Sequence, residues 1–224
     1  MFLHLPKTAG MTLRSILERV YAEHGVEFLT NKGGELRAFA QRPLEARRRV
    51  ALLGGHIPWG AQAAIPGARA ITVLRDPVER VISFYHFTKR APNTLHHTAI
   101  NEGGLTLADC VESGLLDGEL NLQTTMLGDR RAPTPDALLA SAKRNLRACA
   151  AFGLAERFTE SMEYMARELN WPEVDWESRN VTQGRPRAAD LDTGLVDRIR
   201  AGAALDAALH ADAVELFERR VRGG

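Results

Sequence analysis

The stretch FLHLPKTAGMTL, residues 2–13, places a short apolar run directly before a lysine, a glycine and a helical pattern. The apolar residues that follow at helical spacing are Leu13, Ile16, Leu17, Val20 and Tyr21. The stretch therefore predicts a buried strand, a tight turn and a helix that packs on a sheet, with Gly25 as the stop of that helix. This geometry aims backbone N–H groups and the positive end of a helix dipole at one point, where an anion can bind.

Other apolar runs predict the rest of the sheet. The strand candidates are Met1–Leu5, Val50–Leu53, Ala70–Leu74 and Ala150–Leu154. Helical patterns separate them, and such alternation is typical of a parallel sheet. We therefore expect an α/β fold, a three-layer sandwich with a central parallel sheet flanked by helices. The length of 224 residues fits one domain spanning residues 1–224.

Helix starts can be predicted from capping residues. Asp76 is expected to cap the helix after the third strand, with Pro77 in its first position and Glu79 completing a capping box. Later helices are predicted after Thr134, after Thr159 and over the apolar residues Leu205, Leu209, Leu216 and Phe217. The polar stretches Lys89–Leu105 and Gln183–Asp192 are predicted to be surface loops.

Composition limits the classes of partner. The formal net charge is +1, so no overall field attracts nucleic acid or a membrane surface, and anion recognition has to be local. No run approaches the length of about 18 apolar residues that a membrane helix needs, and no signal peptide is evident, so we expect a cytoplasmic protein. Cys110 and Cys149 are too few and too far apart for a disulfide framework or a zinc site, and we expect no metal.

The turn itself offers phosphate-binding groups. Gly10 permits close backbone approach, Thr8 and Thr12 offer hydroxyls, and Lys7 supplies a mobile positive charge. A nucleotide triphosphatase loop, GxxxxGK[ST], puts its lysine after the glycines, whereas here the lysine comes first. Taken alone, the turn also fits a plain strand-to-helix connection with a solvated lysine.

A second stretch strengthens the phosphate interpretation. Together with ITVLRDPVERVISFYHF, residues 71–87, the first stretch resembles the two nucleotide-binding signatures of the sulfotransferases that use 3′-phosphoadenosine 5′-phosphosulfate, PAPS. The similarity is greatest to the carbohydrate-modifying branch that includes heparan sulfate 2-O-sulfotransferase. Fainter similarity covers nearly the whole chain, in NLQTTMLG (121–128), NLRACAAFGLAERFTESMEYM (145–165), RNVT (179–182) and LDAAL (205–209).

The resemblance implies a fold akin to that of the P-loop kinases, with the donor bound at the strand ends. It implies that the loop around the 5′-phosphosulfate consists of Lys7, Thr8, Ala9, Gly10, Met11 and Thr12, and that Arg75 and Ser83 hold the 3′-phosphate. Two loop positions depart from the family pattern. Ala9 stands where glycine is common, and we expect ordinary backbone angles there; Met11 replaces a common Ser or Thr and loses a hydroxyl contact.

The residues themselves agree with a 3′-phosphate site. Arg75 lies where a strand is expected to end, and Ser83 lies two turns into the next helix. A guanidinium and a hydroxyl suit a phosphate dianion. Arg75 alone also fits a surface ion pair with Glu79 or Asp76.

The stretch LLGGHIPWG, residues 52–60, places His56 just beyond a strand and two glycines. A neutral imidazole can accept a hydroxyl proton. His56 also matches the family's GH element, whose histidine is the assigned base; some relatives carry another histidine where this chain has Gly54. Taken alone, His56 fits a histidine that hydrogen-bonds a loop, and Glu102 and Glu119 are reserve candidates for the base. His4 is expected to be buried.

The acceptor is less well defined. Trp59 could stack on a sugar ring, pack an aromatic substrate or belong to the core. The arginines Arg42, Arg47, Arg48 and Arg49 could attract an anionic acceptor or form a solvated helix end.

The sequence thus predicts sulfuryl transfer from PAPS to a hydroxyl of a carbohydrate or small metabolite. His56 is the expected base, Lys7 stabilises the leaving phosphate, and adenosine 3′,5′-bisphosphate, PAP, is the product. The alternatives are a P-loop-type kinase, which would need magnesium, and a non-catalytic nucleotide-binding module.

Overall fold

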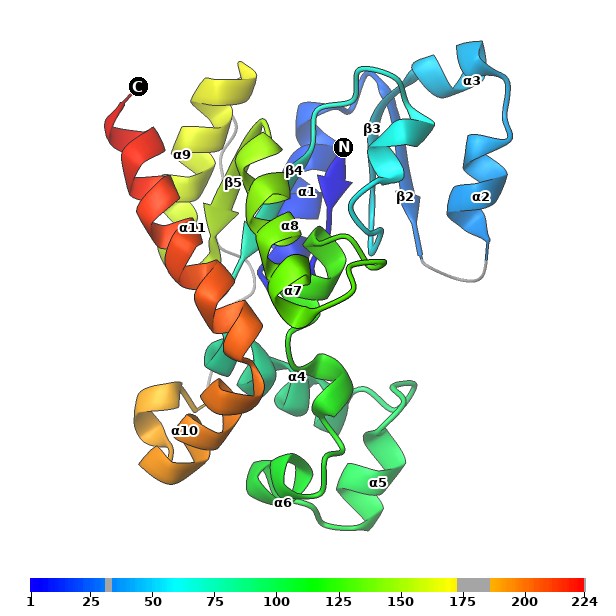
Figure 1. The fold of residues 1–224 in the computed structure, drawn as a ribbon. Helices are drawn as coiled ribbons and strands as arrows, with labels where there is room; N and C mark the ends of the chain where they lie inside the picture. The colour runs from blue at the N-terminus through cyan, green and yellow to red at the C-terminus, as the bar shows by residue number, and fades with distance from the viewer. Residues whose placement is uncertain (31–33, 173–185, 224) are drawn as a thin grey trace.

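The computed structural model describes residues 1–30, 34–172 and 186–223. Over these residues the chain forms an α/β fold around a five-stranded, all-parallel sheet of order β2-β3-β1-β4-β5 (Figure 1). The strands are β1 (Phe2–Leu3), β2 (Gly25–Leu29), β3 (Val50–Gly55), β4 (Ile71–Leu74) and β5 (Ala151–Leu154). The predicted fold class, a parallel sheet with flanking helices, is confirmed.

Helices connect and cover the strands. The α-helices are α1 (Gly10–Val20), α2 (Glu35–Ala40), α3 (Leu44–Arg48), α4 (Pro77–Arg90), α5 (His97–Glu102), α6 (Leu107–Glu112), α7 (Leu122–Leu127), α8 (Pro135–Ala148), α9 (Phe158–Leu169), α10 (Thr193–Gly202) and α11 (Ala204–Arg222). Short 3₁₀ turns are η1 (Ala61–Ala64), η2 (Asp117–Glu119), η3 (Ala155–Arg157) and η4 (Ala188–Asp190). None of the described helices is long and apolar enough to cross a membrane.

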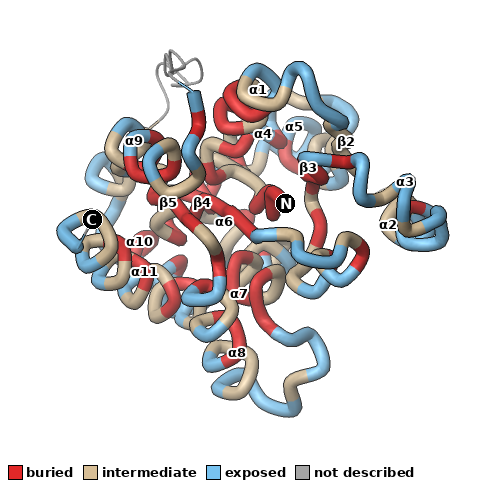
Figure 2. Tube along the Cα trace, turned by 90° about the horizontal axis from the view of Figure 1, so that it is seen from above, coloured by how far each residue is buried: buried red, intermediate tan, exposed pale blue. Residues whose placement is uncertain are grey.

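The sheet carries helices on both faces. Seen from above, α1 and α9 lie on one side, and α7, α8 and α11 lie on the other (Figure 2). The residues of β1, β4 and β5 are buried, as are those of β3 except Ala51, and the main hydrophobic core forms around them. The register places Leu3 of β1 opposite Gly55 of β3 and Thr72 of β4, so the carboxyl ends of these three strands meet at one edge.

A second group of helices, α4, α5, α6 and α10, lies together below the sheet in Figure 1. Its own smaller core is formed by Val78, Val81, Ile82, Tyr85, Ile100, Leu107, Cys110, Leu116, Leu195, Val196 and Ile199. Helix α4 starts directly after β4, at the carboxyl edge of the sheet, and therefore connects the two cores.

One strand was not predicted. Gly25 was expected to stop the first helix, but α1 already ends at Val20 and Gly25 begins β2. A Cβ on Gly25 would lie 2.4 Å from the carbonyl oxygen of Arg49, so glycine allows β2 to approach the start of β3 closely. As an edge strand with one neighbour, β2 keeps its residues partly exposed and lacks the apolar run of a central strand.

The helix caps confirm some predictions and correct others. Asp76 caps α4, because its Oδ1 accepts a hydrogen bond of 3.0 Å from the N–H of Glu79. The predicted reciprocal bond from Glu79 is wrong: the N–H of Asp76 donates to Glu156 at 2.8 Å, and Glu79 accepts from the N–H of Ala188 at 2.8 Å. Partners brought in by the tertiary fold thus replace the local one.

Two further helix starts were predicted. Thr134 caps α8, since its hydroxyl accepts from the N–H of Ala137 at 3.2 Å. The predicted Thr159 cap is wrong, because η3 runs directly into α9, which begins at Phe158. The closing helix is confirmed as α11.

The predicted loop Lys89–Leu105 is partly wrong. Helix α4 continues to Arg90, and α5 forms over residues 97–102 because Ile100 is buried in the smaller core. Residues 183–185 of the second predicted loop and the RNVT stretch, residues 179–182, lie outside the described residues. The rest of that loop contains η4.

Candidate functional site

The turn between β1 and α1 uses two left-handed residues. Lys7 has a φ of 66° and Ala9 has a φ of 65°, and Ala9 is the N-cap of α1. The expectation of ordinary backbone angles at Ala9 is therefore wrong. The chain has to reverse from a buried strand into a helix within a few residues, and a left-handed residue achieves this although it is unfavourable for alanine.

The threonines of this turn are both buried. The Thr8 hydroxyl donates to the carbonyl oxygen of Leu5 at 2.9 Å, which holds the turn closed. Thr12 lies in the first turn of α1, where its N–H donates to Ala9 at 3.1 Å. Met11, by contrast, is 59% exposed and presents a thioether in place of a hydroxyl. The first N–H groups of a helix lack intrahelical acceptors, so those of Gly10 and Met11 are suited to an anion.

Gly10 is required by a neighbouring ring. A Cβ at this position would lie 2.0 Å from the Cδ2 and Nε2 atoms of His4. The His4 ring stacks on Phe2, with centroids 5.3 Å apart, and on His56, with centroids 4.3 Å apart. Burial, followed by the charges of His56, Arg14 and Lys7, lowers the pKa of His4 to about 3. His4 is therefore a buried, neutral side chain, as expected.

His56 has a defined orientation. Its Nδ1 lies 2.8 Å from the carbonyl oxygen of His4. A carbonyl oxygen can only accept, so in the neutral ring Nδ1 carries the proton and Nε2 carries the lone pair. Among the described residues, Nε2 has no hydrogen-bond partner. The half-buried ring is thus prepared to accept a proton at Nε2.

The two signature stretches meet at the carboxyl edge of the sheet. Nη1 of Arg75, just after β4, donates to the carbonyl oxygen of Lys7 at 3.2 Å. Arg75 also forms an ion pair with Glu79 at 3.3 Å and lies 3.9 Å from Glu156. The ion pair with Glu79, which was the alternative to a phosphate-binding role for Arg75, is therefore present. The same guanidinium also joins the two signature stretches.

One side of helix α4 faces the turn between β1 and α1. Nζ of Lys7 lies 3.9 Å from the ring centroid of Phe87. Glu79, Ser83 and Phe87 are spaced four residues apart and share a helix face. Since Glu79 contacts Arg75 and Phe87 contacts Lys7, Ser83 lies between these contacts on the face directed at the turn. The structure therefore brings Lys7 and Arg75 together through a hydrogen bond, and helical spacing puts Ser83 on the α4 face between Glu79 and Phe87.

Sequence reasoning missed Gln123, at the start of α7. Its Oε1 accepts from the N–H of Arg75 at 2.9 Å, and its Nε2 donates to the carbonyl oxygen of Arg75 at 2.8 Å. The buried Asp206 of α11 holds Gln123 in turn, by accepting from its backbone N–H at 3.2 Å. The other carboxylate oxygen of Asp206 accepts from the N–H and the hydroxyl of Thr124, both at 2.7 Å. Gln123 lies in NLQTTMLG and Asp206 lies in LDAAL, two stretches with faint similarity to the sulfotransferases. That similarity was the signal in the sequence that could have pointed to these two residues.

The reserve carboxylates are placed differently. Glu119 pairs with Arg80 at 3.1 Å, and Arg80 is fully buried, so this carboxylate serves the packing of α4. Glu102 is exposed at the end of α5. Trp59 is half-buried and packs against the main core, and its backbone N–H donates to the carbonyl oxygen of Met126 at 2.8 Å.

The arginine cluster before β3 is largely engaged in local contacts. Arg42 pairs with Glu27 at 2.6 Å, and Arg48 pairs with Glu45 at 3.3 Å. Arg47 donates to the carbonyl oxygens of Arg42 and Ala64. These contacts favour the helix-end interpretation of the cluster over an anion-binding one.

The described residues contain no group of three His, Cys, Asp or Glu side chains that could hold a metal ion. Comparison with known proteins adds no further constraint: no family model matches the chain, and no curated protein matches it either.

Proposed function

We propose that this protein is a PAPS-dependent sulfotransferase acting on a hydroxyl group. The observation that carries the proposal is the hydrogen bond between Arg75 and the Lys7 carbonyl, which joins the two nucleotide-like signatures at neighbouring strand ends. PAPS carries anionic groups at both the 5′ and the 3′ positions. Two cationic stretches side by side fit such a ligand better than one with a single phosphate chain.

The finer fold assignment belongs to the same proposal. The turn follows the central strand β1, with β3 on one side and β4 on the other, and we propose that this sheet is of the P-loop kinase type. In that arrangement ligands bind beyond the carboxyl ends of the strands. Lys7 and the first N–H groups of α1 would hold the 5′-phosphosulfate, and Arg75 and Ser83 would hold the 3′-phosphate.

The proposed chemistry is a direct displacement at sulfur. Nε2 of His56 accepts the proton of the acceptor hydroxyl as its oxygen attacks sulfur in line. The bond between sulfur and the bridging oxygen breaks, so the products are a sulfate ester and PAP. Lys7 stabilises the negative charge that develops on the departing 5′-phosphate. To do so, its ammonium leaves the ring of Phe87, a contact worth about 0.5–1 kcal/mol at an exposed site.

Donor binding can be tested by thermal unfolding. PAP should raise the melting temperature more than ADP at equal concentration, because ADP lacks the 3′-phosphate. Arg75→Gln should reduce the PAP shift toward the ADP shift, whereas the exposed Arg198→Gln should leave it unchanged. Equal shifts for PAP and ADP in the unmodified protein would count against the proposal.

Catalysis can be tested with radiolabelled PAPS and a panel of alcohols and sugars. His56→Ala should reduce turnover by roughly a hundred- to ten-thousand-fold while PAP binding persists. The exposed His24→Ala serves as the control. PAP binding without transfer to any acceptor would favour the non-catalytic module, and transfer from ATP with magnesium would favour the kinase.

A further inference from the structure

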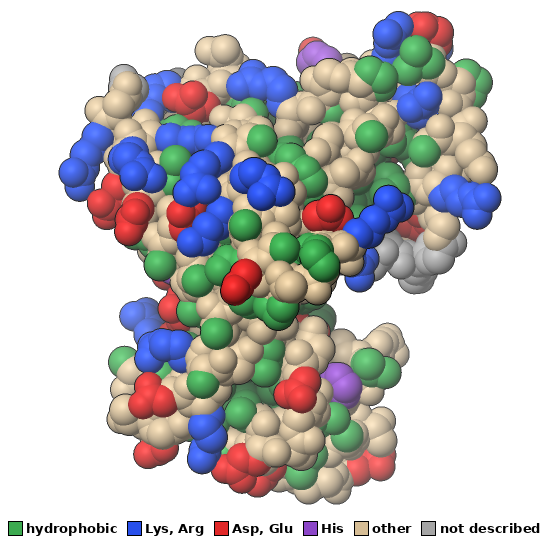
Figure 3. All heavy atoms as spheres, viewed as in Figure 1, with side chains coloured by type: hydrophobic (Ala, Val, Ile, Leu, Met, Phe, Trp, Pro, Cys, Tyr) green, Lys and Arg blue, Asp and Glu red, His purple; other side chains and the backbone are tan. Residues whose placement is uncertain are grey.

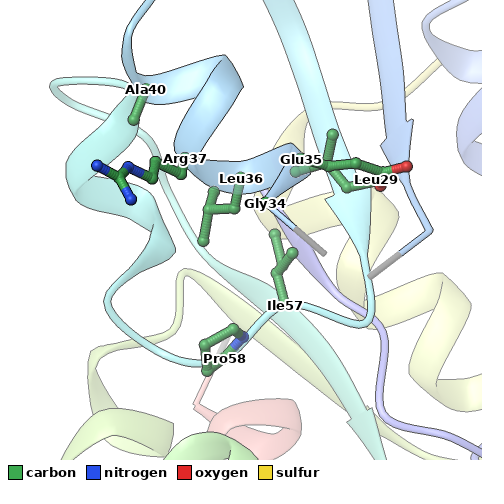
Figure 4. A pocket seen from close by; sticks show the side chains of 8 residues that line it. All are labelled: Leu29, Gly34, Glu35, Leu36, Arg37, Ala40, Ile57 and Pro58. Carbon is green, nitrogen blue, oxygen red and sulfur yellow. The ribbon is translucent and has the colours of Figure 1, made fainter. Parts of the chain in front are cut away.

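A cavity of about 390 Å³ is lined by Ile57 and Pro58, the two residues that follow His56 in the chain. It lies at the carboxyl ends of β2 and β3, where Leu29 is paired with Gly55. Ile57 and Pro58, which directly follow His56, form one wall, and Leu36 of α2 forms the opposite one (Figure 4). This volume falls in the range of small-molecule pockets.

The walls of the cavity are apolar. Leu36, Ile57 and Pro58 face one another in Figure 4, whereas the guanidinium of Arg37 points away from them. The Glu35 carboxylate is turned toward Thr30 and accepts from its N–H at 2.5 Å and from its hydroxyl at 2.7 Å. A charged or densely hydroxylated ligand would therefore lose hydration here without recovering polar contacts.

The cavity wall and the proposed base, His56, belong to the same tight turn of the backbone. The N–H of Ile57 donates to the carbonyl oxygen of Gly55 at 2.8 Å, which forms a tight turn centred on His56. Ile57 is buried, so its side chain is fixed on the cavity side while the His56 ring stacks on His4. A ligand that contacts Ile57 in the cavity therefore contacts the residue next to the proposed base in the chain.

We infer that this cavity binds the apolar body of the acceptor, which is an uncharged alcohol or phenol on a small ring system rather than an acidic glycan. This rests on the proposed function, because the acceptor hydroxyl would be directed at Nε2 of His56. The contacts of Arg42, Arg47 and Arg48 support the choice, since these three arginines of the nearby basic cluster are engaged in local contacts.

Binding can be measured without turnover. With PAP present, 2-naphthol, 4-tert-butylphenol and cyclohexanol should bind in ligand-observed NMR, and methyl glucoside and glucuronic acid should bind much more weakly. Leu36→Arg places a charge in the cavity and should weaken binding of these alcohols by about tenfold or more. Leu95→Arg is the matched control, because Leu95 is 90% exposed and lies outside the cavity lining.

A second variant guards against misfolding. Ala40→Trp should narrow the cavity from its exposed rim and weaken alcohol binding as Leu36→Arg does. A PAP-induced shift in melting temperature equal to that of the unmodified protein shows that each variant is folded. Failure of all three alcohols to bind, or undiminished binding to both variants, would overturn the inference. If the alcohols bind in the cavity but are never sulfated, the proposed function fails while the cavity remains a binding site.

Discussion

At the scale of single residues, the turn after β1 is held in a conformation that alanine disfavours. Ala9 has a φ of 65° and caps α1 without a side-chain hydrogen bond. For L-residues this region is unfavourable by about 1–2 kcal/mol, whereas glycine enters it freely. The resemblance marked position 9 as a common glycine site, but the backbone angles themselves could not be predicted, because they follow from how strand and helix are joined in three dimensions.

Ala9→Gly should therefore stabilise the protein. We expect the free energy of unfolding to rise by about 1 kcal/mol, because the strain at position 9 is removed. Urea unfolding measures the change. Ala140→Gly, at an exposed position inside α8, is the control and should lower stability by about 0.5–1 kcal/mol. A loss of stability in both variants would contradict the strained turn.

The buried His4 predicts a dependence of stability on pH. Its pKa falls from the ordinary value of 6.5 to about 3 in the folded protein, mainly because of burial. Between these values the unfolded chain binds the proton and the folded one does not, so stability decreases as pH falls below 6.5. At pH 5 the loss attributable to His4 should be about 2 kcal/mol.

The non-titrating variant His4→Gln isolates this effect. It should be less stable than the unmodified protein at pH 7, yet lose less stability between pH 7 and pH 5. The slope of the free energy of unfolding against pH is the quantity to compare, because the substitution alters packing at every pH and so shifts the whole curve. Parallel slopes for the two proteins would show that His4 does not carry the pH dependence.

At the scale of elements, α7 and α11 fix the junction between β4 and α4. Gln123 clamps the backbone N–H and carbonyl of Arg75, and Asp206 holds Gln123. Gln123→Met should lower stability by about 1–3 kcal/mol, because buried polar groups lose their partners. It should also reduce the PAP-induced shift if Arg75 binds the donor. The exposed Gln41→Met should change neither the stability nor the PAP-induced shift in melting temperature. An unaltered PAP shift in Gln123→Met would show that donor binding does not depend on the hydrogen bonds between Gln123 and Arg75.

Helix α4 is also tied to η2 by a buried ion pair. Arg80 is fully buried and pairs with Glu119, whereas Arg198 and Glu112 form a similar pair at the surface, both at 3.1 Å. Glu119→Ala would leave a buried guanidinium without its carboxylate and should cost about 3–5 kcal/mol. Glu112→Ala should cost no more than about 1 kcal/mol. Similar losses in denaturant unfolding would mean that Arg80 is solvated.

The elements that could be predicted were those with a strong local signal. Central strands with buried apolar runs and helices with a cap and an apolar face, such as α4 and α8, follow from sequence alone. Strand β2 and helix α5 do not, because one is a half-exposed edge and the other is short and stabilised through Ile100. The same reason explains Gln123: its importance comes from a contact 48 residues away in the chain.

At the scale of the whole molecule, the described residues form two hydrophobic cores of unequal size, and α4, which directly follows β4 of the larger core, packs in the smaller one. The larger one surrounds the sheet, and the smaller one holds α5, α6 and α10 below it (Figure 1). Surface charge is mixed: Figure 3 shows basic and acidic side chains near one another on the upper part of the face that it draws. Ion pairs at the surface include Arg147 with Asp212 at 2.6 Å and Arg157 with Glu160 at 2.7 Å. Local groups, rather than an overall field, therefore determine which anions bind.

The smaller core should open more readily than the sheet. Hydrogen exchange measured by mass spectrometry should show lower protection for peptides of α5 and α6 than for peptides of β3 and β4, because less apolar surface is buried around them. Peptides of α9, which pack on the sheet, provide a helical control and should exchange slowly. Equal protection of α5 and β4 would indicate that the two cores unfold as one unit.

The ring of His4 occupies the space that a side chain at position 10 would need. Any residue other than glycine there has to displace that ring, and the ring is stacked on His56, which hydrogen-bonds the carbonyl of the same residue 4. Positions 4, 10 and 56 are consequently not free to vary one at a time. In a mutational scan they should show strong epistasis, with substitutions at position 10 tolerated best when a smaller residue at position 4 has already made room.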